Sequence, residues 1–306
     1  MSNVAILGIF VADLAFRAGR QPAMGETIMG ADFKMGPGGK GSNQAVAAAR
    51  AGANVTFISR LGRDAFGEIA LATWKAEKIR TDKVALTDSA PTGAAYIFVQ
   101  EGTGENAIIV VPGAANSISK ADVDQAAAEI RAAKAFITQL EQPIEAALHG
   151  LTIAKQAGVA TIFNPAPAAP LPDAIYALCD YITPNETEAY AITGVQVGGL
   201  DSAKAAADRL LQRGVGCALI TLGEAGALYH TAKESVLMPA FSAGKVAETT
   251  GAGDAFNGGF AAALAAGRNP KDAVRFGCAA AGISVTRPGT APSMPTLSEI
   301  ETLLAR

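Results

Sequence analysis

Short apolar runs alternate with longer segments of helical periodicity over most of the chain. Residues 4–9 form a continuous apolar run, which predicts a strand buried on both faces. An Ala-rich helix at 42–51, a strand at 55–59 and an amphipathic helix at 66–79 are expected to follow. The N-terminal part therefore already mixes strands with helices.

After residue 118 the alternation becomes regular. Predicted strands lie at 135–139, 160–164, 181–183 and 217–221. Predicted helices lie at 120–132, 144–156, 203–213, 254–266, 270–284 and 297–304. Strands that alternate with helices usually form a parallel sheet with helices on both faces. The pattern therefore predicts an α/β fold, a three-layer α/β/α core around a mostly parallel central sheet.

Two segments, 13–36 and 92–111, interrupt this alternation. The first carries many glycines and predicts only short strands at 27–29 and 33–35. The second reads as a hairpin, with strands at 94–100 and 107–111 and a turn at 101–105. We expect both segments to pair into a small separate sheet, within a single domain that spans 1–306.

Composition narrows the class of protein. Half of the 306 residues are apolar, which is enough for one large α/β domain or one domain with an appendage. The net charge is −3 with no long basic run, so no nucleic-acid groove is expected. No apolar run reaches the roughly 18 residues that span a bilayer. The dispersed cysteines Cys179, Cys217 and Cys278 and the absence of a signal-peptide pattern favour a cytoplasmic protein.

The candidate chemistry is concentrated in residues 250–258 (TGAGDAFNG). Small residues at 251–253 leave backbone N–H groups bare at a helix start, which together with the helix dipole form a site for an anion. Asp254 lies in the first turn, where a carboxylate can take a proton from a hydroxyl that attacks a phosphoryl group. The alternative is a helix start in which Asp254 only complements the dipole. The three small residues before Asp254 favour the anion site.

A second glycine-rich stretch, 38–45 (GGKGSNQA), also precedes a helix. Lys40 and Asn43 offer donors to sugar hydroxyls or phosphate, although a flexible turn with a solvated lysine would look the same. Its glycines also meet the dinucleotide spacing Gly-x-Gly-x-x-Gly. That match is weak, because the stretch does not directly follow the first strand and contains Pro37. A Walker A loop is excluded, since Gly41 stands where Ser or Thr is needed.

Polar residues follow several predicted strands, and these strand ends meet at one edge of a parallel sheet. In 183–188 (TPNETE), Asn185 and Glu188 fit either a hydrated Mg²⁺ or a simple helix cap. The turn 221–226 (TLGEAG) offers a hydroxyl and bare backbone to a nucleotide, or only ends a strand. Glu141 is either a sugar ligand or a surface carboxylate.

Taken together, the motifs resemble those of the ribokinase-like (PfkB-type) sugar kinases over nearly the whole chain. They are 38–45 (GGKGSNQA), 138–141 (TQLE), 164–168 (NPAPA), 182–189 (ITPNETEA), 220–223 (ITLG), 250–258 (TGAGDAFNG) and 285–293 (VTRPGTAPS). The resemblance implies transfer of the γ-phosphate of ATP to the primary hydroxyl of a small sugar, with ribose as the first candidate. It also implies that 13–36 and 92–111 form a β lid that closes over the sugar and mediates a homodimer.

By position, the resemblance implies a role for each motif residue. The residues that would bind the sugar are Asp13, Gly39, Lys40, Asn43 and Glu141. Asp254 would deprotonate the sugar hydroxyl, while the N–H groups of Gly251, Ala252 and Gly253 would hold the transferring phosphate. The residues that would line the ATP site are Asn185, Thr221, Gly223, Gly226 and Gly253.

The resemblance further implies two cations. Mg²⁺ would accompany ATP near Glu188. K⁺ would act as an activator that orders the anion site without touching ATP. Its ligands, several of them backbone carbonyls, would be Glu248, Thr250, Ser284, Arg287, Gly289 and Ser293.

Two departures from the family pattern bear on specificity. Val11 stands where the family has an asparagine two residues before the sugar-binding Asp13, so a hydrogen-bond partner is lost and the acceptor can change. Deoxyribose, a keto-deoxy sugar acid and a nucleoside are the alternative acceptors. Glu248 replaces the usual aspartate, which leaves K⁺ activation open. Two other classes of protein are kept as alternatives. One is a non-catalytic sugar-binding regulator, and the other is a dinucleotide oxidoreductase, which rests only on the dinucleotide-like spacing of the glycines.

Overall fold

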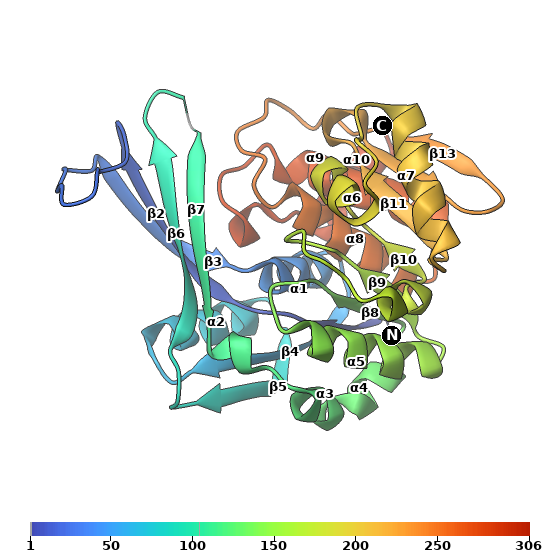
Figure 1. Cartoon of the computed structure of the whole chain (residues 1–306), viewed down its shortest axis with the longest axis horizontal. Coiled ribbons are helices and arrows are strands. Elements are labelled where there is room, and N and C mark those ends of the chain that lie inside the picture. Colours follow the sequence, from blue (N-terminus) through green and yellow to red (C-terminus); the bar gives the residue numbers. More distant parts are fainter. Residues whose placement is uncertain (1, 104) are drawn as a thin grey trace.

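The computed structural model describes residues 2–103 and 105–306, whose strands form two sheets (Figure 1). The strands of the large sheet are β1 (Asn3–Leu7), β4 (Asn54–Gly62), β5 (Arg80–Thr87), β8 (Ala135–Thr138), β9 (Ala160–Phe163), β10 (Tyr181–Ile182), β11 (Cys217–Thr221), β12 (Ala227–His230) and β13 (Ser235–Met238). Their order is β13-β12-β11-β10-β9-β8-β1-β4-β5. All neighbours from β11 to β5 are parallel, and β12 and β13 add an antiparallel edge.

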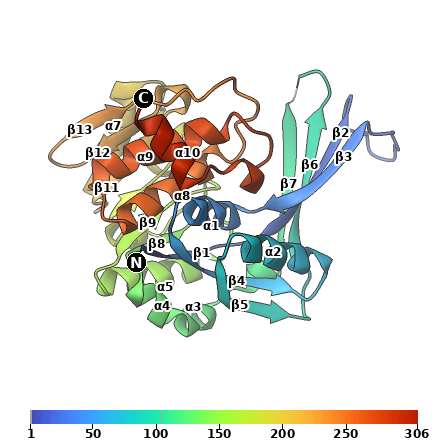
Figure 2. The same ribbon diagram turned by 180° about the vertical axis from the view of Figure 1, so that it is seen from behind.

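Helices cover both faces of this sheet (Figures 1 and 2). One face carries α1 (Lys40–Arg50), α2 (Ala65–Ala76), α8 (Ala252–Ala265), α9 (Pro270–Ser284) and α10 (Leu297–Leu304). The other carries α3 (Lys120–Gln125), α4 (Ala127–Ala132), α5 (Ile144–Gln156), α6 (Glu186–Thr193) and α7 (Leu200–Gln212). Each face has its own apolar core, because the central strands of a covered parallel sheet are buried on both sides. The predicted α/β fold class is confirmed.

The small sheet projects from the side of this body (Figure 1). Its strands are β2 (Val11–Ala18), β3 (Asp32–Gly38), β6 (Thr92–Gln100) and β7 (Asn106–Gly113), in the order β3-β2-β6-β7. The register sets Asp13 opposite Gly36 on one side and Ala95 on the other. The predicted small separate sheet is therefore present, built from the two segments that lacked the regular alternation.

Several predicted elements differ from the structure. The strand predicted at 27–29 is wrong, because no strand forms there and Met29 is exposed. The helix predicted at 120–132 is two helices that meet at Ala126, whose ψ of 5° breaks the helical path. Strands β2, β5, β12 and β13 were not predicted. β5 and β13 are half-exposed edge strands, β12 has only four residues, and β2 follows no single pattern of burial. Gly104 of the predicted turn 101–105 lies outside the described residues.

The sequence analysis predicted no apolar segment long enough to span a bilayer. None of the helices in residues 2–103 and 105–306 is both long and apolar enough to cross a membrane.

Candidate active site

Close backbone contacts bring the start of α1 against the end of β1. A Cβ on Gly41 would lie 2.6 Å from the Cα of Gly8, so no side chain fits between these elements. Gly39 caps α1 with φ +88°, and a Cβ there would lie 2.6 Å from the Ile9 carbonyl oxygen. Glycine is needed at position 41 because a side chain there would collide with Gly8, and at position 39 because only glycine combines the positive φ with the close approach. The glycine-rich stretch thus fixes where Lys40 and Asn43 project.

The start of α8 forms the opposing wall. Gly251 is its N-cap and adopts the left-handed conformation at φ +85°. Ala252 N–H donates to the Thr249 carbonyl at 3.2 Å. Within the described chain, the N–H groups of Gly253 and Asp254 donate to no protein oxygen, and a Cβ on Gly253 would meet no atom within 4 Å. Open space and two unused donors at a helix N-terminus make an anion site.

Asp254 is held in this site by two consecutive residues of α1. Asn43 Nδ2 donates to Asp254 Oδ2 at 3.0 Å, and Gln44 Nε2 donates to Oδ1 at 3.0 Å. The carboxylate is 7% exposed. Burial raises the pKa of Asp254, while Lys40 and the two amide donors oppose that rise. The carboxylate keeps free lone pairs and is poised to accept a proton.

Glu141 and Lys40 lie at the entrance to the same space. Glu141 Oε2 accepts from the Lys40 backbone N–H at 2.7 Å. Burial raises the pKa of Glu141 to about 7, against the attraction of Lys40. Burial lowers the pKa of the Lys40 ammonium, but the carboxylates of Asp254, Glu141 and Glu188 outweigh it and the pKa is raised. Lys40 therefore stays cationic and brings positive charge to the anion site.

Asp13 approaches from the small sheet. A Cβ on Gly38 would lie 2.1 Å from Asp13 Oδ1, so the carboxylate packs directly on the glycine backbone. Burial raises the pKa of Asp13 to about 7, and the nearby charges of Asp254 and Glu248 add to the rise. The site thus gathers the carboxylates of Asp13 from β2, Glu141 from the loop after β8 and Asp254 from α8, and Glu141 and Asp254 also act on the charge of Lys40.

The residues predicted for ATP lie at the ends of β10 and β11. Asn185 and Glu188 form a reciprocal capping box at the start of α6, with distances of 2.9 and 2.8 Å, so one Glu188 oxygen is already used. Gly223 adopts φ +52°, and a Cβ there would come no closer than 4.0 Å to another residue. A Cβ on Gly226 would lie 2.0 Å from the Met238 carbonyl oxygen. Gly226 is therefore required by the packing of the β12–β13 edge, whereas Gly223 leaves open backbone.

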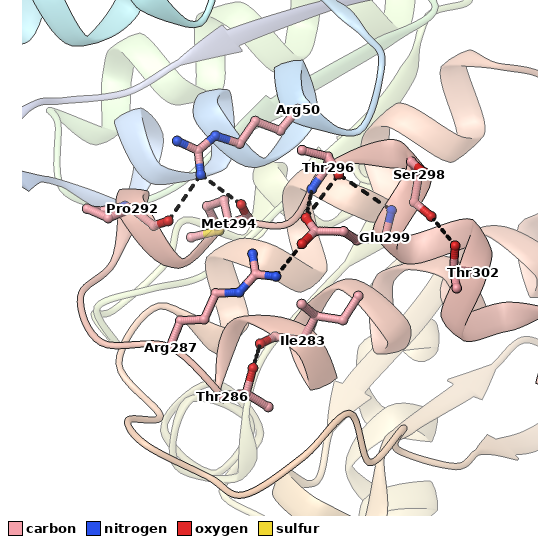
Figure 3. Close-up of polar contacts among 10 residues, drawn as sticks. All are labelled: Arg50, Ile283, Thr286, Arg287, Pro292, Met294, Thr296, Ser298, Glu299 and Thr302. Carbon is pink, nitrogen blue, oxygen red and sulfur yellow. Dashed lines mark hydrogen bonds and ion pairs between the residues drawn. The ribbon is translucent and has the colours of Figure 1, made fainter.

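The residues predicted for K⁺ lie in the loop before α8 and in the segment from Ser284, the last residue of α9, to Ser293; these form two adjoining loops. Glu248 Oε2 accepts from the Gly289 N–H at 2.8 Å, which joins the loops directly. The side chain of Arg287 pairs with Glu299 of α10 and so is not available to the site (Figure 3). The Ser284 hydroxyl donates to the Ala281 carbonyl within α9 at 2.9 Å, and the Ser293 hydroxyl donates to the Thr290 carbonyl at 2.7 Å. Ser284, Arg287 and Ser293 could serve a cation through carbonyl or hydroxyl oxygen, and Thr250 borders the anion site.

Several buried polar residues around Asp254 were not assigned a role from the sequence. They are Gln44, Gln139, Asn164, Thr183 and Asn257, each at most 6% exposed. The sequence feature that could have identified them is an amide or hydroxyl side chain within a motif whose other residues predict a buried helix or the end of a buried strand. Such groups are kept in a core only when they are hydrogen-bonded.

Residues 1–297 match the family described as pfkB family carbohydrate kinase. The chain is 40% identical over 297 residues to the ribokinase of Haemophilus influenzae, covering 97% of this chain and 96% of that protein. It is 35% identical over 304 residues to the deoxyribokinase of Salmonella typhi, covering 99% of both. The structure of Arabidopsis thaliana ribokinase complexed with ribose and ATP has a TM-score of 0.92 at 30% identity, covering 99% of this chain and 98% of that one.

Proposed function

The chain belongs to the pfkB family of carbohydrate kinases, and we propose that it transfers the γ-phosphate of ATP to the primary hydroxyl of ribose. The observation that carries this proposal is the placement of Asp254. It lies beside two unused N–H donors at an open helix start and is oriented by two amides of α1. Phosphoryl transfer depends on positioning and charge stabilisation, and this arrangement offers both.

In the proposed reaction Asp254 accepts the proton of the sugar hydroxyl as the hydroxyl oxygen attacks the γ-phosphorus, and the bond between the γ-phosphorus and the β–γ bridging oxygen breaks to release ADP. The N–H groups of Gly253 and Asp254, with the helix dipole, stabilise the negative charge on the transferring phosphate. Lys40 adds positive charge from the opposite wall. Ala252 contributes less than the motif implied, because its N–H already bonds to Thr249.

Sugar binding is assigned to Asp13, Glu141, Asn43 and the backbone around Gly39. Among the described residues, the buried Asn43 Oδ1 has no hydrogen-bond partner, which suits a hydroxyl donor from a ligand. Ionised carboxylates accept hydroxyl hydrogen bonds strongly. Because burial raises the pKa of Asp13 and of Glu141 to about 7, we expect sugar affinity to weaken as the pH falls below 7.

Mg²⁺ is proposed to enter with ATP. In residues 2–103 and 105–306 no cluster of three or more His, Cys, Asp or Glu is arranged to hold a metal ion. This fits an ion that is held mainly by substrate phosphates and waters, with one carboxylate nearby. Glu188 keeps one oxygen for a water of that ion, and the ion would neutralise charge on the phosphates. Asn185, Thr221 and Gly223 line the remaining ATP site.

K⁺ activation is also proposed, with the carbonyls of the two loops around Glu248, Thr250 and Gly289 as ligands. The Glu248–Gly289 hydrogen bond leaves one carboxylate oxygen for the ion. Turnover measured in KCl against LiCl at equal ionic strength tests this proposal. Equal rates in the two salts would refute it.

A second acceptor, deoxyribose, is favoured by Val11. Val11 is 2% exposed and lies two residues before Asp13 on β2, so both side chains point to the same face of the strand. An apolar side chain there suits a C–H group better than a hydroxyl.

A coupled ADP assay with Mg·ATP and a panel of ribose, 2-deoxyribose, keto-deoxy sugar acids and nucleosides decides the acceptor. Ribose should give the highest kcat/KM; a better rate with another acceptor would move the assignment to it.

A homodimer through the small sheet is proposed from its uncovered edge. Ile108, Ile109, Val110 and Val111 of β7 are 48, 64, 43 and 59% exposed. Four consecutive exposed apolar residues on an edge strand invite pairing with a second chain. We expect light scattering to give twice the chain mass, and Ile109→Lys to give a monomer. A monomeric parent protein would refute the dimer.

A further inference from the structure

The completely buried side chain of Gln44 connects Asp254 to the central sheet. Its Nε2 donates to Asp254 Oδ1 at 3.0 Å and to Asn164 Oδ1 at 3.1 Å. Its Oε1 accepts from Gln139 Nε2 at 2.5 Å. Gln139 lies just after β8 and Asn164 just after β9, so Gln44 can satisfy its neighbours with only one orientation of its amide.

The hydrogen bonds continue from Asn164 back to α8. Asn164 Nδ2 donates to the Thr183 carbonyl at 3.0 Å, and the Thr183 hydroxyl donates to Asn257 Oδ1 at 2.7 Å. Asn257 Nδ2 then donates to the Gly253 carbonyl at 2.8 Å. The chain of bonds thus leaves Asp254, crosses the ends of β9 and β10, and returns to the residue that precedes Asp254.

We propose that Gln44 is a positioning residue that fixes the orientation of the Asp254 carboxylate and keeps it ionised. This inference rests on the proposed function, in which Asp254 is the base. Asn164, Thr183 and Asn257 hold the Gln44 amide in place and tie the same unit to Gly253 of the anion site.

The physical need for Gln44 follows from burial. A buried carboxylate prefers to be neutral, and burial is the largest influence that raises the pKa of Asp254. The Asn43 and Gln44 donors act in the opposite direction. A base is useful only when ionised, so loss of the Gln44 donor should move the acidic limb of the rate profile to higher pH.

Helix packing keeps the donor within reach. A Cβ on Gly258 would lie 2.6 Å from the Gln44 carbonyl oxygen and 2.5 Å from Ala47 Cβ. Glycine at 258 therefore allows α8 to pack closely against α1. The distance between Gln44 and Asp254 is set by backbone contact between two helices, as a positioning role requires.

The test compares kcat against pH for the parent, Gln44→Met and Gln142→Met. Gln142 is a matched control, since it is 4% exposed and bonds only to Thr138 Oγ1 and the Gln139 carbonyl, both at 2.7 Å. Loss of one charge-assisted donor should move the acidic limb of Gln44→Met upward by about one pH unit. Turnover near pH 6.5 should fall by up to about 10-fold, with partial recovery at pH 9. The KM for ATP should stay within about twofold of the parent value, and Gln142→Met should keep the parent profile.

Gln44→Glu guards against a folding defect in the first variant. It keeps the side-chain shape but sets a second carboxyl about 3 Å from Asp254. Full ionisation of the pair then requires loss of a second proton whose pKa is strongly raised, so the limb moves further upward. A purely structural Gln44 would leave the limb in place, and limbs within about 0.3 pH unit of the parent in both Gln44 variants overturn the inference. An inactive parent, or an Asp254→Asn variant with parental turnover, would instead refute the proposed function.

Discussion

Replacing Asp13 by asparagine is expected to stabilise the protein without ligands above neutral pH while weakening sugar binding. Burial, together with the charges of Asp254 and Glu248, raises the pKa of Asp13 from its ordinary 3.8 to about 7. A carboxyl whose folded pKa is raised stabilises the fold below its unfolded pKa, and that contribution is lost as the pH rises to the folded pKa. An asparagine has no charge to bury and avoids the loss.

The size of the effect follows from the same numbers. The rise from 3.8 to about 7 is roughly three pKa units. At ~1.4 kcal/mol per unit, ionised Asp13 costs on the order of 4 kcal/mol of unfolding free energy at pH 8. At pH 4.5, where the folded state keeps its proton and the unfolded chain has lost most of its own, the cost is only about 1 kcal/mol. The advantage of Asp13→Asn should therefore grow with pH.

The assay is thermal unfolding at pH 4.5, 6 and 8, without sugar or ATP. Asp13→Asn should raise the Tm by several degrees at pH 8, and by much less at pH 4.5, given roughly 2 °C per kcal/mol in a protein of this size. Asp88→Asn, whose side chain is 85% exposed, is the control for loss of one negative charge. A Tm that falls at pH 8, or a gain in Tm that does not change with pH, would refute the reasoning.

The same variant should bind ribose about 100-fold more weakly, because charge-assisted hydrogen bonds are lost.

Three further predictions concern glycines at the site. Gly253→Ala should keep the Tm, because the added methyl meets no protein atom within 4 Å, yet lower kcat by about 100-fold by intruding on the phosphate space. Gly251→Ala, at φ +85°, should instead cost about 1–2 kcal/mol of stability in chemical unfolding. Gly258→Ala should lose about 1–3 kcal/mol and also turnover, whereas Gly259→Ala, which faces Ala280 of α9 at 3.0 Å, should keep its kcat.

The sequence predicted the parts of the fold that follow regular periodicity. The strands at 135–139, 160–164 and 217–221 appear within a residue or two as β8, β9 and β11. They were predictable because both faces of these strands are buried and their apolar runs are continuous. β5 and β13 lie at the sheet edges, where half-exposed strands carry no such run. β2 was missed because it passes from the core into the small sheet and its side chains follow no single pattern of burial.

The candidate site was predictable one motif at a time. The glycines of 38–45 and 250–258 marked two helix starts, and Asn43 and Gln44 of the first contact Asp254 of the second. The anion site itself stays a prediction. The chain of hydrogen bonds that runs from Gln44 through Asn164 and Thr183 was not predictable from the sequence. Its members are far apart in sequence, and the hydrogen-bond partners of buried amides depend on tertiary packing. The sequence predicted that Gly226 contacts ATP. In the structure, the close approach of Gly226 to the Met238 carbonyl is enough to explain why a glycine is needed there.

Single-turnover phosphate transfer by the parent protein and by Asp254→Asn tests the central claim most directly. Both proteins are mixed with Mg·ATP and ribose, and sugar phosphate is followed in time while sugar affinity is measured separately by calorimetry. The parent should form ribose 5-phosphate, and Asp254→Asn should bind ribose with similar affinity but react roughly 10³-fold more slowly. An Asp254→Asn rate close to that of the parent would contradict the assignment of Asp254 as the base on which this account depends.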